Sequence, residues 1–109
     1  MATFTAKTIA DGQMATSETN MYLVPAATKG YVKQVTIYNT NAAQQTISIF
    51  IKRSGGTSRQ IRRFVLDQYE SVDLVDDGDT LELSTGDAIR GLTTTATAVD
   101  YVVMGVEET

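Results

Sequence analysis

The sequence predicts an all-β protein, a single-domain β-sandwich (jelly-roll-like or Ig-like) built from about eight short antiparallel strands. Three observations lead to this prediction. Short segments that alternate apolar and polar residues recur about every ten residues, turn residues separate them, and no long stretch carries a helical apolar stripe. The chain has 109 residues, which is the size of one domain.

Two neighbouring segments in the middle of the chain carry the clearest strand signals. Residues 46–52 place isoleucine at every second position, and residues 31–40 alternate in the same way. The polar segment 39–45 joins them, so the two strands are predicted to form a hairpin. Val32 and Phe50 interrupt the polar faces, and we expect these strands to lie centrally or to meet a neighbouring chain.

The other strands are located by turn residues and by alternation. Pro25 ends a short strand over residues 22–24, because proline cannot donate a ladder hydrogen bond. The glycine pair at 55–56 and the acidic or glycine-containing segments 76–79 and 86–87 predict turns. The strands predicted between these turns are residues 59–66, 71–75, 80–83, 88–92 and 94–106.

The domain organisation is predicted to be simple. Residues 21–109 form the β-sandwich domain, and residues 1–20, which are polar and weakly patterned, form an N-terminal arm or an edge strand. The last strand is apolar on both sides, with Val99, Tyr101 and Val103 on one and Val102, Met104 and Val106 on the other.

The composition excludes several kinds of site. The chain has no Cys and no His, so it lacks thiolate ligands and the commonest general base. Its net charge of −4 disfavours nucleic acid, and no apolar run is long enough to span a membrane. No nucleophile or phosphate-loop motif is present. We therefore expect a protein that is not an enzyme, takes no cofactor and binds neither nucleic acid nor membrane.

Acidic residues crowd the segment from Asp67 to Asp87, with no Lys or Arg between them. One interpretation is a calcium site, since hard cations prefer several oxygen ligands. The EF-hand pattern fails, however, because Val75 and Ser84 stand where ligands are required. A pair of glycosidase carboxylates is a further alternative, disfavoured by the small size and the absence of Trp. Solvated turns and an acidic face are the favoured interpretation.

Basic residues gather around the glycine pair, so a hairpin there would bring them to one end or one face. The functional interpretation is that they contact an acidic protein surface or phosphate. The alternative is a solvated edge that discourages edge-to-edge aggregation. The candidate interface residues are Phe4 in the N-terminal arm and Lys52, Arg53, Arg59, Arg62 and Arg63 in the hairpin.

The basic and acidic segments adjoin each other, and two consequences are open. If they lie on different faces, one copy could dock its basic face onto the acidic face of another, which gives a homo-oligomer. If they pair within one sheet, they stabilise the fold through cross-strand contacts. The sequence alone leaves both open.

Five stretches from residue 22 onward form a recognisable order of strands and turns: 22–26, 35–40, 47–51, 81–90 and 103–107. They comprise an entry strand closed by proline, a strand ending in Asn-Thr and a strand of alternating isoleucine. An L-x-L-x-x-G-D-x-I element and a last strand ending in Gly-x-Glu follow. This order resembles small β-sandwich virion structural proteins of tailed bacteriophages, of the decoration or cement kind.

The resemblance implies a virion component made in the host cytoplasm, most directly a capsid decoration or cement protein that binds and reinforces the assembled shell. Its partners would be the major capsid protein or other virion proteins, and it would form a homo-oligomer, with a trimer favoured. The alternatives are a neck, tail or fibre component, a calcium- or glycan-binding β module, and a small glycosidase. Replacement of Arg62 and Arg63 by Glu is expected to weaken binding to particles without unfolding the monomer.

Overall fold

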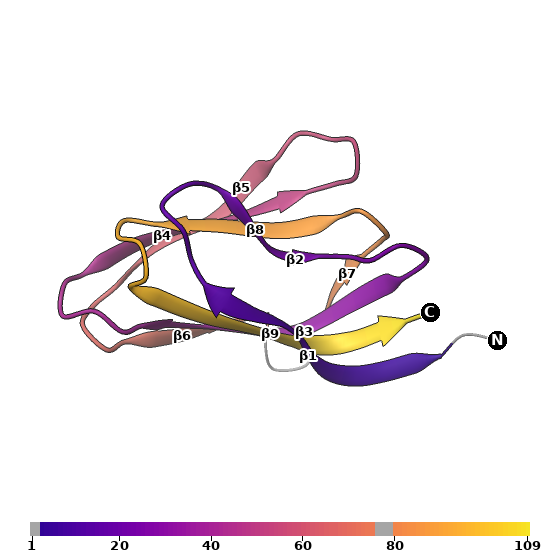
Figure 1. Ribbon diagram of the computed structural model, residues 1–109, viewed down its shortest axis with the longest axis horizontal. Coiled ribbons are helices and arrows are strands. Elements are labelled where there is room, and N and C mark those ends of the chain that lie inside the picture. The colour runs from indigo at the N-terminus through magenta and orange to yellow at the C-terminus, as the bar shows by residue number, and fades with distance from the viewer. Residues whose placement is uncertain (1–2, 76–79) are drawn as a thin grey trace.

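The computed structural model describes residues 3–75 and 80–109, and these form two antiparallel sheets packed face to face (Figure 1). The predicted all-β sandwich is confirmed. The described ranges contain nine strands: β1 (Phe4–Gln13), β2 (Thr19–Leu23), β3 (Lys29–Asn39), β4 (Gln45–Lys52), β5 (Arg59–Leu66), β6 (Ser71–Leu74), β7 (Leu81–Leu83), β8 (Ala88–Thr93) and β9 (Val99–Glu108).

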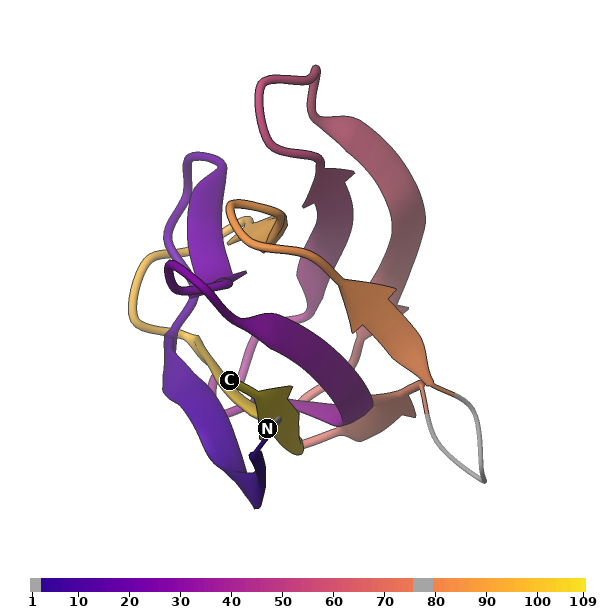
Figure 2. The ribbon, with the colours of Figure 1, turned by 90° about the vertical axis from the view of Figure 1, so that its right-hand side faces the viewer.

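The strand order identifies the kind of sandwich. Sheet A has the order β1-β9-β3, and β6 and β7 both pair with the far side of β3, one along each half of it. Sheet B has the order β2-β8-β4-β5. With β6 and β7 counted as two halves of one edge strand, two four-stranded sheets interleave in chain order as in a jelly roll. Figure 2 shows the two layers from one end.

The core lies between the sheets and is filled by the apolar members of the alternating strands. Inward side chains from sheet A meet those of sheet B, as the period of two requires. Fully buried members are Val32, Ile37, Leu83, Val99 and Val103 from sheet A and Ile47 from sheet B. Residues 3–75 and 80–109 contain no helix long and apolar enough to cross a bilayer.

The predicted hairpin between β3 and β4 is wrong, because β3 belongs to sheet A and β4 to sheet B. Residues 39–45 instead carry the chain from one sheet to the other. The crossing is held by Asn39, whose buried side-chain amide donates to the carbonyls of Ala43, Leu66 and Asp67 at 3.0, 3.1 and 3.0 Å. Alternation shows which side of a strand faces the core. It does not show whether two strands pair in one sheet or lie in opposite sheets, because both arrangements give the same pattern.

Two further expectations are corrected by local backbone irregularities. A β-bulge between Val32 and Gln34 turns Val32 into the core, although simple alternation had placed it on the polar face. The last strand begins at Val99 rather than residue 94, because Thr97 adopts a positive φ of 61° in a turn. The predicted turn at 76–79 lies outside the described residues.

A buried polar contact joins the two sheets near the chain ends. The Tyr22 hydroxyl on β2 donates to Glu107 Oε2 on β9 at 2.7 Å, and both residues are buried. Burial, followed by the contact with the Glu107 carboxylate, raises the pKa of Tyr22 far above its usual value of 10. The folded protein therefore favours the neutral, protonated form of the Tyr22 side chain.

Replacing Tyr22 by Phe is expected to lower the free energy of unfolding by about 1.5–3 kcal/mol at neutral pH, because Glu107 loses a charge-assisted hydrogen bond. The raised pKa makes this tyrosine favour folding fully below pH 10, and its contribution falls as the unfolded chain ionises above that pH. Urea titrations between pH 7 and 11 check both effects. A variant as stable as the original, with an unchanged alkaline slope, would contradict the assignment.

Candidate functional site

The predicted basic hairpin consists of β4 and β5, and it extends from the body of the sandwich (Figure 2). The turn between them is confirmed, since Gly55 has a φ of 71° and the Gly56 amide donates to the Arg53 carbonyl at 2.9 Å. The structure does not hold the five hairpin cations in one cluster. It divides them among a turn, a groove between the sheets and the outer face of sheet B.

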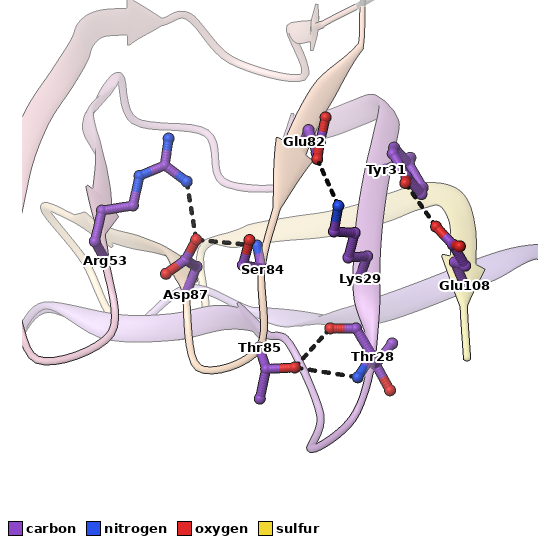
Figure 3. A network of polar contacts seen from close by, with 9 residues as sticks. All are labelled: Thr28, Lys29, Tyr31, Arg53, Glu82, Ser84, Thr85, Asp87 and Glu108. Carbon is purple, nitrogen blue, oxygen red and sulfur yellow. Dashed lines mark hydrogen bonds and ion pairs between the residues drawn. The ribbon is translucent and has the colours of Figure 1, made fainter. Parts of the chain in front are cut away.

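Arg53 is engaged in a contact that stabilises the fold. Its Nη1 lies 2.9 Å from Asp87 Oδ2, and the carboxylate also accepts from the amide of Ser84 at 3.0 Å (Figure 3). The amide of Ser54 donates to Asp87 Oδ1 at 2.9 Å. Burial by itself would raise the pKa of Asp87, but these three donors outweigh it and hold the pKa below the usual value. Asp87 thus ties the hairpin turn to the turn between β7 and β8, and the L-x-L-x-x-G-D-x-I element has a structural explanation.

Arg59 and Arg62 lie beside a groove between β5 and the edge strands of sheet A. An apolar hollow of about 200 Å³ is lined by core residues together with Ile61 and Arg62, and a wider hollow of about 520 Å³ includes Arg59. The Arg62 guanidinium carbon lies 5.9 Å from the centre of the Phe64 ring, within range of a cation–π contact. The groove therefore combines an apolar floor with a cationic rim.

Strand β5 is an edge strand with unusually little cover. All residues from Arg59 to Arg63 are exposed, and Ile61 and Val65 keep 52% and 48% of their surface accessible. Within the described ranges, its outer edge pairs with no other strand. An exposed edge that carries apolar side chains is suited to binding a partner, while its arginines oppose non-specific pairing.

The outer face of sheet A carries mostly carboxylates, and we name it the acidic face. Its register places the following side chains outward: Asp11, Asp73, Glu82, Asp100, Glu108 and Lys29 among the charged residues, and Phe4, Tyr31, Tyr38, Val102, Met104 and Val106 among the apolar and aromatic ones. Lys33, at the bulge of β3, joins them beside Phe4, Tyr31 and Val106. Phe4, predicted as a contact residue, is 64% exposed on this face. Several members are fixed: Glu108 accepts from the Tyr31 hydroxyl at 2.7 Å, and Lys29 lies 3.3 Å from Glu82 (Figure 3).

The outer face of sheet B has the opposite charge, and we name it the basic face. Its outward residues, by register, are Lys52, Arg63 and Arg90 with Asn20, Leu23, Phe50, Val65 and Leu92. Arg90 is fixed by Glu18, whose Oε2 lies 2.8 Å from Nη1. Lys52 and Arg63 have no carboxylate within ion-pair distance among the residues that the structure describes.

The strand residues of the basic and acidic segments lie in different sheets, whereas Asp87 of the acidic segment lies in a turn and contacts Arg53. Asp73 and Glu82 belong to the acidic face, whereas the hairpin belongs to sheet B. Within residues 3–75 and 80–109, no three Asp or Glu side chains come together in a way that could hold a metal ion. Residues 76–79, on which the calcium interpretation rests most, lie outside the described part.

Sequence reasoning missed several members of the two faces. Arg90 stands apart from the hairpin in sequence, and Asp11, Asp100 and Glu108 lie outside the acidic segment. A signal for part of the acidic face was present, since every second residue of β9 from Asp100 to Glu108 points outward. What the sequence lacked was the pairing of β9 between β1 and β3, which brings these residues together.

No protein-family model and no curated protein matches the chain. A solved structure of Bacillus endospore appendages, described as disulfide-linked pili, is similar with a TM-score of 0.53 and 17% identity over 98% of this chain and 88% of that one. A structure of the CBM22-1–GH10 modules of Clostridium thermocellum endo-1,4-β-D-xylanase 10B with xylohexaose gives a TM-score of 0.41 and 13% identity, over 99% of this chain and 24% of that one. The first similarity supports the sandwich fold, and the second is too weak to support a conclusion.

Proposed function

We propose that the protein is a non-catalytic virion structural protein of a tailed bacteriophage, and that it acts as a capsid decoration protein that reinforces the assembled shell. It would bind a capsid protein through the groove side of the β4–β5 hairpin. The observation that carries the proposal is the exposed edge strand β5, where Arg59, Ile61 and Arg62 stand accessible beside an apolar groove.

The chemistry of this strand supports a protein partner of acidic character. Ile61 offers apolar area, and the two arginines offer charge that can pair with carboxylates on the partner. Repeated binding across a shell adds avidity, so that each individual contact can be weak and the shell still gains stability. The pilus-like neighbour is described as disulfide-linked, whereas this chain has no Cys and would need a non-covalent contact.

The test measures binding to particles. The full chain is mixed with purified heads of tailed phages and pelleted, and saturable co-sedimentation with heads is expected. Replacing Arg59 and Arg62 by Glu is expected to weaken that binding at least about tenfold, since the two new carboxylates would repel a carboxylate-rich partner. Circular dichroism checks that the variant remains folded.

The matched control is Lys29→Glu with Lys33→Glu, which makes the same change in net charge on sheet A and should leave head binding unaltered. Equal occupancy of heads by the Arg59/Arg62 variant and the original chain would remove the hairpin from the proposal. Binding to tails alone would replace the decoration role by the neck, tail or fibre alternative. Absence of binding to every head would overturn the proposal.

A further inference from the structure

We propose that copies of this chain associate head to tail, with the acidic face of one copy docked on the basic face of the next. This contact goes beyond the proposed function and uses other surfaces, since it involves the two outer sides of the sandwich and not the groove beside β5.

The apolar content of the outer faces is the first observation. In a β-sandwich the outward residues of each strand are ordinarily polar. Here β9, which is central in sheet A, points Val102, Met104 and Val106 outward, all of them only half-buried. In the middle of sheet B, Phe50 and Leu92 also point outward. Contiguous apolar groups in the middle of a sheet face, rimmed by charges, are typical of an interaction surface.

The charges of the two faces indicate which surfaces of two copies bind each other. The acidic face carries five carboxylates and two lysines, and one of these lysines, Lys29, is paired with Glu82. On the basic face, Lys52 and Arg63 remain unpaired within the described ranges. A symmetric dimer would bring like charges together in either case, whereas the acidic face of one copy complements the basic face of another. The contact is therefore heterologous.

The shapes of the two faces agree with this pairing. A shallow, mainly apolar hollow of about 230 Å³ lies between Phe4, Tyr31, Lys33 and Val106 on the acidic face, and an apolar side chain of a second copy fits there. A polar hollow of about 270 Å³ on the basic face includes Lys52 and Arg90 in its lining, which suits a carboxylate.

The direction of assembly follows from the position of the faces. The two sheets lie one above the other, so their outer faces point to opposite sides of the molecule (Figure 1). A heterologous contact between opposite sides leaves one free acidic face and one free basic face at the two ends of every assembly. Copies can therefore keep adding, and the expected product is an open series of sizes.

Sedimentation velocity on the full chain tests this association. The average mass is expected to rise over a roughly hundredfold range of concentration at low salt, and to fall at about 1 M salt, where charges are screened within about 3 Å. Two charge-reversed variants are compared: Lys52→Glu with Arg63→Glu on the basic face, and Asp11→Lys with Asp100→Lys on the acidic face. Each alone is expected to associate at least about tenfold more weakly than the original.

Mixing the two variants gives the decisive result. Each variant has two faces of like charge and should associate weakly. Mixed in equal amounts, the two variants again offer opposite charges, so the average mass should return to that of the original chain. The Arg59/Arg62 double variant, which alters the groove side of the same hairpin, should associate like the original chain. The proposal is overturned if the original chain stays a monomer throughout, if charge reversal leaves the mass unchanged, or if the mixture fails to recover it.

Discussion

Replacement of Gly105 by Ala is expected to lower the free energy of unfolding by at least about 3 kcal/mol and the melting temperature by roughly 10 °C or more. Gly105 lies on β9 opposite Val32, next to the bulge in β3. A Cβ atom there would stand 2.1 Å from the carbonyl oxygen of Tyr31 and 3.1 Å from the Val32 Cα. Both are backbone atoms, so relief requires the central strands of sheet A to separate.

Gly91 supplies the matched control. A Cβ at this position would also be crowded, with Met14 Cε at 2.5 Å and Met21 Sδ at 2.7 Å. These atoms are the ends of flexible side chains, which can move aside, so Gly91→Ala is expected to cost no more than about 1–1.5 kcal/mol. Thermal and urea unfolding of the two variants measure the difference. Equal losses would contradict the close approach of β9 to β3.

Replacement of Asp87 by Ala is expected to cost about 3 kcal/mol at neutral pH. The change leaves the amides of Ser54 and Ser84 without their acceptor and Arg53 without its partner. Most of the loss comes from the two amides, because Arg53 is largely exposed and a surface ion pair contributes little. Arg53→Gln, which keeps the amides bonded, is therefore expected to cost less than about 1 kcal/mol, and urea titrations compare the two variants.

The same carboxylate makes stability depend on acid. Since the pKa of Asp87 is lower in the folded protein, its contribution is complete above the unfolded value of about 4 and is lost as the pH falls through the lower folded value. The free energy of unfolding of the original chain should thus decline below about pH 4, and more steeply than that of Asp87→Ala. Parallel acid limbs for the two proteins would show that Asp87 does not hold this role.

The positions of most strands follow from local chemistry and were predictable. Strand β5 begins and ends at the predicted residues, and its start follows from the turn at the glycine pair. The partner of each strand was not predictable. Residues 39–45 fit a hairpin loop by composition, and only the burial of Asn39 between distant carbonyls shows that they cross between sheets.

The candidate surfaces were predictable in the same limited sense. Alternation separates Arg62 from Arg63 onto opposite sides of β5, and Phe4 is exposed while its contact role stays a prediction. Arg53 was grouped with the other cations because it is near them in sequence, but Asp87 engages it from 34 residues away. The acidic face draws on five strands, and no window of the sequence contains it.

The pairing of the first strand with the last governs how the chain can fold. β9 lies between β1 and β3, and its register joins Phe4 to Glu108 and Lys29 to the same residue. Sheet A therefore has no middle until β9 is in place, and until then β1 and the β9-facing edge of β3 stay unpaired. Because such distant contacts carry a large loop-closure entropy, folding is expected to take milliseconds to seconds.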